Sequence, residues 1–419
     1  ETVQNRCEIK HLFFMPVRIH TSPIHFYRKE RTNAVETNGL FALGLHRILT
    51  HTGAGLLGLF LPIYLFHLFQ NDIRFVLAYG LLYYLLAGIF EPLGAMIMTR
   101  IGLPQAMRLG TVFYILFFGI LASKNLSVSV VAFGSLAALV IWHVIYWIPY
   151  HTEFAESANP KRMGRAVGTI AAVSSCIGMI LPIISGSIIT MFGYSILFLI
   201  AAGIIFSSAI PLGRIRAIKE RYEYTFMQTF RELFHKKHRR FLFIFAAEGA
   251  ESVVGFLVWP VFLFEVLGEN YIQTGIITAL VTLLSILLQM TVGKWIDSKP
   301  DNQKLLKTGM SLTSLGWIIK AFVHSMTQVI FAGTFHSLAS ILMRTPFEAL
   351  MYTKAADAGH YVDEYTVLRE MALCTGRVII LGVFLLLSPI FDYWIAFLLT
   401  ALVTFAFERL SAHPPTLQN

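Results

Sequence analysis

Cysteine is scarce in this sequence: the 419 residues contain three, at positions 7, 176 and 374. They form no CxxC pair, so the sequence indicates neither a disulfide framework nor a zinc site. The sequence also lacks the phosphate-binding GxxxxGK(S/T) loop and the HExxH and GxSxG motifs of hydrolases. We therefore expect no enzyme activity, no metal ion, no cofactor and no direct use of ATP.

Charged residues are scarce as well, at 14% of the chain against 56% hydrophobic residues. An ordinary soluble domain carries about a quarter of its residues as charged ones. The charges that are present favour the basic side, with 33 Lys and Arg, 24 Asp and Glu, and a net charge of +9. Because the basic residues lie between apolar runs, they indicate membrane topology and no nucleic-acid partner.

Long apolar runs are what the sequence has in abundance. Each is near the ~20 residues that a helix needs to cross a bilayer. They predict an all-α polytopic membrane protein with twelve transmembrane helices. The runs cover residues 40–68, 73–98, 104–122, 127–150, 166–191, 194–212, 240–267, 271–296, 304–323, 326–353, 365–388 and 391–409.

The connectors between the runs differ in basic content. Those after even-numbered runs carry most of the Lys and Arg, including the cluster between Arg214 and Arg240, whereas the others hold only Arg74 and Lys124. By the positive-inside bias, both termini are expected to be cytoplasmic. The predicted domains are an N-terminal cytoplasmic tail (1–39), a first six-helix bundle (40–212), a central cytoplasmic loop (213–239), a second six-helix bundle (240–410) and a C-terminal tail (411–419).

The central loop has apolar residues at Phe226, Phe230, Leu233 and Phe234 among many basic ones. Their spacing predicts an amphipathic helix on the cytoplasmic surface. The alternative is a solvated tether whose basic residues only favour the topology, and the charge of the stretch favours this second interpretation.

The second half of the sequence repeats features of the first at an offset close to 198 residues. PIYLF at Pro62 pairs with PVFLF at Pro260, and SSCIG in the fifth run pairs with ALCTG in the eleventh. The polar stretch from Gly94 to Gly110 pairs with GKWIDSKPDNQKLLKTG, from Gly293 to Gly309. Two halves with six spans each would face the same way, so a pseudo-twofold axis along the membrane normal would relate them.

Twelve predicted spans in two halves, a basic central loop and a polar elbow in each half resemble the major facilitator superfamily. The family elbow has glycine, an acid four residues later, then basic residues and another glycine. The first copy keeps Gly94, Arg100 and Gly102, and the second keeps Gly293 and Asp297. Thr99 or Met98 replaces the first acid. The resemblance implies two pseudo-symmetric bundles around a central cavity, with Asp297 stabilising the outward-facing state at the cytoplasmic gate.

The fifth run contains GMILPIISG at 178–186, which loosely resembles a family pattern associated with antiporters. This resemblance slightly favours export over import. A helix rich in glycine and proline also packs closely against its neighbours, which explains the pattern nearly as well.

Ionisable residues deep in a membrane span are costly, so they are candidates for function. Arg47 and His51 lie roughly 10 and 16 Å into the first run and share a helix face. Glu248 and Glu251 share a face of the seventh run, which is the counterpart of the first. We expect both pairs to face the cavity and the glutamates to carry protons. The alternative is a static salt bridge between a glutamate and Arg47.

Arg377 lies deep in the eleventh run, seven residues after Glu370. It could hold an anionic group of a substrate or pair with Glu370 or a seventh-run glutamate, since arginine does both well. Aromatic residues of the second and fourth runs could form a wall that stacks on a solute, or they could serve packing alone. The candidates for this wall are Tyr84, His143 and Trp147.

Four charged residues lie near the predicted cytoplasmic ends of the tenth and eleventh spans. Arg344 and Glu348 are four apart in sequence, and Arg369 and Glu370 are adjacent. Their positions favour contacts at the cytoplasmic gate over binding of substrate.

These features predict a secondary active transporter that moves a small solute by alternating access, coupled to protons. One alternative is a receptor or assembly scaffold that keeps the fold without transporting, and another is a transporter of lipid-like substrates. The expected partners are a small-molecule substrate, protons and the lipid bilayer. We expect a monomer that spans a prokaryotic cytoplasmic membrane many times.

Overall fold

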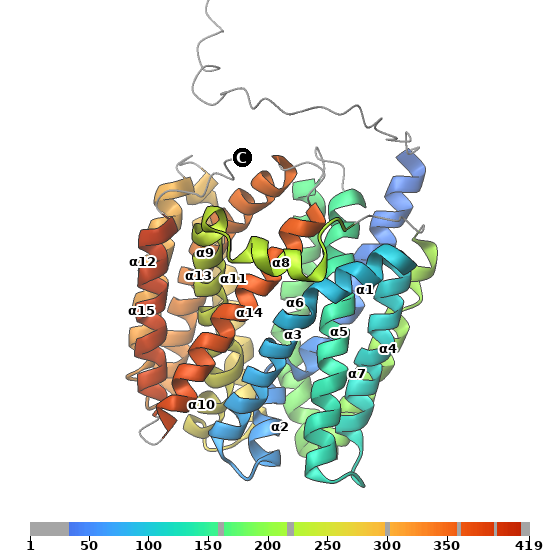
Figure 1. The fold of residues 1–419 in the computed structure, drawn as a ribbon. Helices are drawn as coiled ribbons and strands as arrows, with labels where there is room; N and C mark the ends of the chain where they lie inside the picture. Colours follow the sequence, from blue (N-terminus) through green and yellow to red (C-terminus); the bar gives the residue numbers. More distant parts are fainter. Residues whose placement is uncertain are drawn as a thin grey trace, which may run out of the picture.

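A computed structural model describes residues 33–157, 163–215, 222–297, 302–357, 362–388 and 392–411. Within these residues every regular element is a helix. The long helices run side by side (Figure 1). Their bounds are α1 (Asn33–Gly58), α2 (Phe60–Leu68), α3 (Ile73–Ile101), α4 (Leu103–Ala122), α5 (Val128–Ser157), α6 (Met163–Phe192), α7 (Tyr194–Ser208), η1 (Pro211–Arg214), α8 (Phe226–Leu233), η2 (Lys236–His238), α9 (Arg239–Val253), η3 (Val254–Val258), α10 (Trp259–Val266), α11 (Tyr271–Asp297), α12 (Asn302–Lys320), α13 (Met326–Asp357), α14 (Val362–Leu386) and α15 (Tyr393–Ser411).

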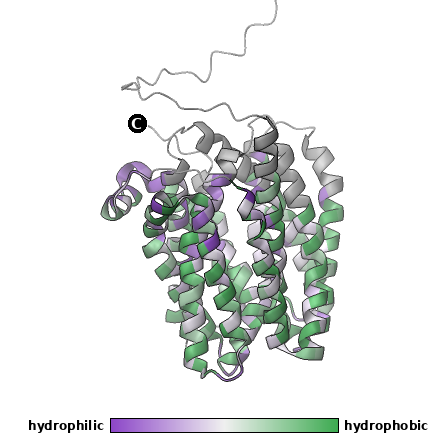
Figure 2. Cartoon of the chain, turned by 90° about the vertical axis from the view of Figure 1, so that its right-hand side faces the viewer, coloured by the Kyte–Doolittle hydropathy of each residue, from purple (hydrophilic) through white to green (hydrophobic). Residues whose placement is uncertain are grey.

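The helices are apolar enough for a bilayer. In the described part of the chain, eight are long and apolar enough to cross a membrane, or nine if α1 and α2 form one bent span. Hydrophobic residues dominate the long helices, and hydrophilic residues gather at the end of the molecule where α8 lies (Figure 2). The chain is therefore a polytopic helical membrane protein, while the count of twelve spans and the cytoplasmic location of the termini stay predictions.

Two of the predicted single helices are irregular, one by a bend and the other by a π-helical turn. The run at 40–68 forms α1 and α2, which meet at Leu59 with a bend of 44°. The run at 240–267 forms α9 and α10, joined by the π-helical turn η3. A proline follows each irregularity, Pro62 in α2 and Pro260 in α10. Proline lacks the N–H that would continue the helical hydrogen bonds, so the repeated prolines explain irregularities about 198 residues apart.

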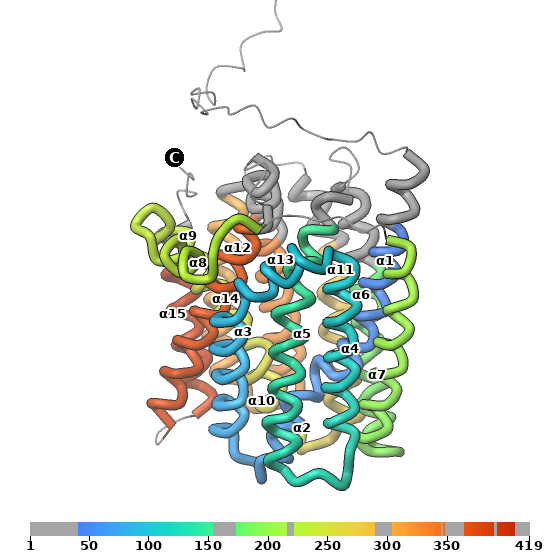
Figure 3. Tube along the Cα trace, turned by 45° about the vertical axis from the view of Figure 1, so that its right-hand side comes forward, coloured from blue at the N-terminus to red at the C-terminus, as the bar shows by residue number. Residues whose placement is uncertain are grey.

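The same packing arrangement occurs twice along the chain. In the first half α1 packs on α6 and α7, α4 packs on α5 and α7, and α3 packs on α5. In the second half α9 packs on α14 and α15, α12 on α13 and α15, and α11 on α13. Figure 3 shows the two sets side by side. Each helix of the first set thus has a counterpart in the second.

The most extensive contacts between the two halves lie along two helix pairs, α3 with α14 and α6 with α11, and α2 also packs on α10 and α5 on α14. At the pair of α6 and α11 the backbones are in direct contact. A Cβ atom at Gly186 of α6 would overlap the carbonyl oxygen of Tyr271, and one at Gly275 of α11 would overlap that of Pro182. The glycine and proline run of the fifth span therefore serves close packing between the halves.

Aromatic rings join the halves at the end where α2 and α10 lie (Figure 1). The ring of Tyr271 on α11 lies 4.9 Å from that of Phe264, 6.1 Å from Phe60 and 5.7 Å from Tyr194. His67 of α2 lies edge-on to Phe264 at 5.5 Å. Such pairs add stability beyond the apolar area that they bury, so this end is held together by contacts between rings of both halves.

The central loop contains the short helix α8, as its apolar spacing predicted. Thr225 caps the helix by accepting a hydrogen bond from the N–H of Gln228. α8 lies across the end of the molecule opposite α2 and α10 (Figure 1) and packs on α3 and α14. Leu233 is buried against them, whereas Met227 and Phe234 are 73% and 60% exposed. A solvated tether is therefore the wrong description of this segment.

Two consecutive residues before α8 connect the halves. The N–H of Tyr222 donates to Thr99 Oγ1 on α3 at 3.0 Å. The next N–H, that of Glu223, donates to Glu364 Oε1 on α14 at 2.9 Å. Thr99 is one of the two residues, with Met98, that stand where the family elbow has its acid, so in this chain the elbow of the first half binds the central loop.

Thr99→Val should weaken this connection, because valine keeps the shape of threonine and lacks the hydroxyl acceptor. Leaving the buried N–H of Tyr222 without a partner costs about 1–3 kcal/mol. Thermal unfolding of the purified protein measures the loss. The matched control is Thr308→Val, since that exposed hydroxyl donates only to Lys304 of its own helix. Equal stability of the two variants would show that the bond to Tyr222 contributes nothing.

Candidate functional site

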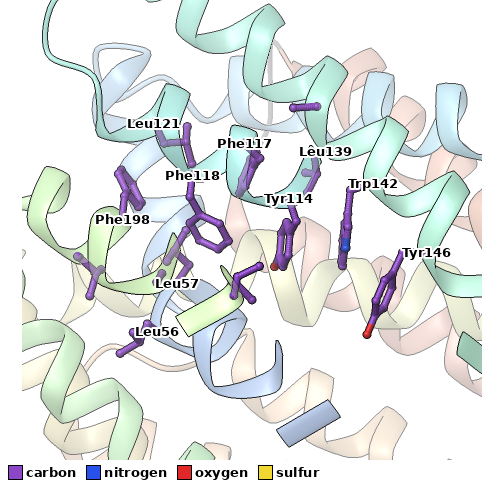
Figure 4. Close-up of a cluster of buried hydrophobic side chains, with 14 of the residues drawn as sticks. Leu56, Leu57, Tyr114, Phe117, Phe118, Leu121, Leu139, Trp142, Tyr146 and Phe198 are labelled. Atoms are coloured by element: carbon purple, nitrogen blue, oxygen red, sulfur yellow. The ribbon is translucent and has the colours of Figure 1, made fainter. Parts of the chain in front are cut away.

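A buried aromatic core fixes the first helix of the first half (Figure 4). Tyr114 of α4 stacks on Trp142 of α5 at 4.0 Å, and Trp142 stacks on Tyr146 at 5.6 Å. The Tyr146 hydroxyl lies 2.8 Å from His46 Nε2, and His46 Nδ1 lies 2.7 Å from the carbonyl oxygen of Ser208. Both ring nitrogens of His46 are thus used, so α1 is locked to α5 and α7.

This anchor directs Arg47 toward α5. The guanidinium carbon lies 5.1 Å from the ring centroids of both Trp147 and Tyr150. Arginine binds well to aromatic faces by cation–π attraction. No ion pair between Arg47 and Glu248 or Glu251 occurs among the described residues. The alternative of a static salt bridge between the halves is therefore wrong for this conformation.

His51 follows one turn after Arg47 and is half-buried. It lies beside α6, where a Cβ atom at Gly178 would stand 3.8 Å from His51 Nε2. Arg47 and His51 share a side of α1, as predicted from their spacing, but they contact different helices.

Glu251 is the centre of a charged network in the second half. It is buried, with 4% of its surface exposed. Trp317 Nε1 donates to its Oε1 at 3.3 Å, and Arg344 donates to its Oε2 at 3.0 Å. His336 Nε2 lies 3.8 Å from Oε1. Helices α12 and α13 thus contact α9 at this carboxylate. Arg344, which the sequence analysis placed beside Glu348, forms an ion pair with Glu251.

Lys320 belongs to the same region, and sequence reasoning missed it. Its Nζ lies 4.2 Å from the ring centroids of both Trp259 and Trp317, and the residue is buried. A lysine at the end of a membrane helix usually extends its ammonium group to water, but Lys320 at the end of α12 is buried. Tryptophans at both 259 and 317 were the only sequence signal for a buried ammonium group.

Glu248 lies one turn before Glu251 on α9 and is half-buried. Its Oε2 atom is buried and has no hydrogen-bond partner among the described residues. Arg344, Arg369 and Arg377 interact with it electrostatically. Glu248 is therefore an acid with spare hydrogen-bonding capacity near three arginines.

Arg377 spans the contact between α14 and α3. Its guanidinium carbon lies 4.7 Å from the ring centroid of Tyr84, and its Nε has no hydrogen-bond partner in the described part of the chain. Glu370, which was one predicted partner of Arg377, lies 3.0 Å from Arg369 instead. Arg369 also lies over the ring of Phe245 at 5.5 Å. Arg377 thus keeps a free donor at the junction of the halves.

His143 does not stand in an open aromatic wall. Its Nδ1 lies 2.7 Å from the Tyr83 hydroxyl, and its Nε2 lies 3.8 Å from Glu91 Oε2. His143 and Glu91 are both buried. Glu91 was not selected as a candidate from the sequence, because a count along the helix does not show which helix a side chain faces.

The elbow residues have partly structural roles. A Cβ atom at Gly94 would overlap the carbonyl oxygen of Val144 on α5. Gly102 ends α3 with a φ of 87°, a conformation that favours glycine. Arg100 is exposed at the end of α3. Gly293 and Asp297 lie in α11 and Glu348 lies in α13, but their side-chain environments lie outside the described residues.

Among the described residues, no group of three or more His, Cys, Asp or Glu could hold a metal ion. The site consists instead of arginines over aromatic rings and buried acids. The first half supplies Arg47 and His51, and the second supplies Glu248, Glu251 and Arg377, the last of which lies at the contact of α14 with α3. This arrangement places cationic and acidic side chains on both sides of the contact between the halves.

Comparisons with known proteins agree with this architecture. The structure is similar to two crystal structures of a POT family transporter. One is in complex with 5-aminolevulinic acid (TM-score 0.67, 13% identity, 88% of this chain and 94% of that one). The other is in complex with a thioalcohol conjugated peptide (TM-score 0.67, 14% identity, the same coverage). At this identity the likeness shows the fold alone.

The sequence comparisons identify the family. The uncharacterized protein YqgE of Bacillus subtilis (strain 168) is 24% identical over 293 residues, which are 67% of this chain and 67% of that protein. The family description of the Major Facilitator Superfamily matches residues 43–361, well over half of the chain. The resemblance seen in the elbows and the repeat is confirmed, and this chain belongs to the Major Facilitator Superfamily.

Proposed function

We propose that the protein is a secondary active transporter that moves a small solute by rocking its two halves around a site between them. The observation that carries this proposal is the set of buried charges at and beside the junction of two halves with matching packing. Charges inside membrane helices are costly and are kept for function. In this proposal α1 and α2 form one bent span, and α9, η3 and α10 form one span with a π-helical turn, which gives twelve spans in total.

We propose that Glu251 couples transport to protons. Its carboxylate is held by Arg344 at 3.0 Å. A proton on Glu251 would remove the negative charge and release Arg344, whose side chain is 44% exposed. Proton binding would thus break a contact between α9 and α13, and proton release would restore it. A change of contacts between helices is what a coupling ion must cause to shift a conformational equilibrium.

The proposed substrate is a small zwitterion or carboxylate. Arg47 and Arg377 can bind an anionic group, because the Nε of Arg377 has no partner among the described residues and Arg47 lies on aromatic rings. Glu248 can bind an amine through its free Oε2. Such a solute would contact both halves at once. One of the similar structures holds 5-aminolevulinic acid, which has both kinds of group.

The test is transport by the purified protein in proteoliposomes with an imposed pH gradient. A pH-sensitive dye inside the vesicles reports proton movement, and labelled 5-aminolevulinic acid reports solute uptake. We expect solute accumulation that requires the gradient. If neither solute nor protons move, and cysteine labels at the two ends of the bundle react equally with and without solute, a scaffold is the better description. Export and a prokaryotic cytoplasmic membrane stay predictions from the sequence.

A further inference from the structure

Glu91 is a buried acid that the proposed function leaves without a role. It lies within α3, between Ile73 and Ile101, and is 0% exposed. Neither of its side-chain oxygens has a hydrogen-bond partner among the described residues. A charged carboxylate without partners costs several kcal/mol in such surroundings. These surroundings therefore favour the neutral, protonated form of Glu91 in the present conformation.

A base lies next to this acid. His143 Nε2 on α5 stands 3.8 Å from Glu91 Oε2, and it too has no hydrogen-bond partner in the described residues. The Tyr83 hydroxyl lies 2.7 Å from the other ring nitrogen, and the two rings are edge-on at 5.6 Å. Tyr83 thus orients the imidazole so that Nε2 faces Glu91. A movement of about 1 Å would bring the two atoms within hydrogen-bond distance.

The other half of the protein also faces Glu91. α3 and α14 approach closely here, since a Cβ atom at Gly88 would stand 2.9 Å from Cys374 Cβ. The groups of α14 that act electrostatically on this region are Glu370, Cys374 and Arg377. Glu370 is already paired with Arg369. The Nε of Arg377 has no hydrogen-bond partner in the described part of the chain, so Arg377 is the cation that can bind a charged Glu91.

We propose that Glu91 and His143 form a proton-binding site at the contact between the halves, with Arg377 as its counter-charge. In this conformation Glu91 holds the proton. When the gap closes, the proton passes from Glu91 Oε2 to His143 Nε2, which leaves a carboxylate and an imidazolium. The imidazolium then releases the proton to water, and the carboxylate binds Arg377. Because Arg377 belongs to the other half, loss of the proton draws α14 toward α3.

The site deepens the proposed function and rests on it, since only in a transporter would this proton be coupled to solute movement. It adds a second proton-binding acid to Glu251, on the first half of the chain. The two acids are in different surroundings: Glu251 is bound by Arg344 in this conformation, whereas neither oxygen of Glu91 has a hydrogen-bond partner among the described residues.

Infrared spectroscopy of the purified protein in lipid nanodiscs tests the site without transport. A protonated carboxyl group absorbs at a higher frequency than a carboxylate, and the band shifts in deuterated water. We expect the wild-type spectrum at neutral pH to contain such a band. Glu91→Gln should lose the intensity of this band that one carboxyl group contributes. Glu251→Gln, the matched control, should keep that part because Glu251 is paired with Arg344. An unchanged band in Glu91→Gln would overturn the proposal.

Two further variants control for misfolding and test the role of His143. Glu91→Asp retains a carboxyl group and should therefore retain the band. If the band is lost in Glu91→Gln and kept in Glu91→Asp, its loss is not due to misfolding. His143→Gln should keep the band but slow its disappearance after a jump to alkaline pH, because the exchange partner is gone. An unaltered rate would remove His143 from the site. Absence of any transport by the wild-type protein would overturn the proposed function and leave the assignment of the infrared band intact.

Discussion

Glu251→Gln is expected to abolish accumulation of solute against a gradient. Glutamine has nearly the size of glutamate and can still accept the hydrogen bond that Trp317 donates at 3.3 Å. It cannot carry a negative charge or exchange a proton. Arg344, now 3.0 Å from the carboxylate, would have the same neutral partner throughout the cycle. The change that couples proton binding to the movement of α13 would therefore be lost.

The measurement is accumulation of labelled solute in proteoliposomes with an imposed pH gradient. Accumulation should fall to the level of vesicles without the gradient, while exchange of solute across the membrane continues. A solute that binds the folded state should still raise the melting temperature. The control is Glu269→Gln, because that acid is exposed in the turn between α10 and α11. Full accumulation by Glu251→Gln would rule out its role as the coupling acid.

Much of the fold follows from apolar runs and their repetition. The runs predicted helices in the right order, and Pro62 and Pro260, which revealed the repeat, also mark the two irregularities. The bend and the π-helical turn were not predicted, because a run that is apolar throughout shows no change in composition where the helix geometry changes. The amphipathic spacing around Phe230 predicted α8, but composition could not show that it packs on α3 and α14.

The candidate site was predicted less well than the fold, for a geometric reason. Depth along a helix follows from counting residues, whereas the direction of a side chain depends on which helices pack around it. Glu251 was found by depth, but its partner is Arg344, not Arg47. Lys320 was missed because it lies near a helix end, although its ammonium group contacts two tryptophans in the interior. Glu91 was passed over although it is fully buried.

Gly94→Ala is expected to cause one of the largest losses of stability that a single methyl group can cause in this protein. The methyl group would overlap the carbonyl oxygen of Val144 on α5. A backbone carbonyl cannot rotate away as a side chain does, so α3 and α5 would have to separate. Overpacking of this kind costs typically about 1–3 kcal/mol, and more where the backbone must move.

The control for this prediction is Gly119→Ala in α4, where a Cβ atom would meet nothing within 4 Å. Alanine at an open helical position should stabilise the protein by about 0.5–1 kcal/mol relative to glycine. Thermal unfolding of the two purified variants should thus move in opposite directions from the wild type. If both variants melt at the wild-type temperature, Gly94 is not a packing residue. The close contact of α3 with α5 would then have been shown to tolerate a side chain, and the glycine that this chain shares with the family elbow would need another explanation than packing.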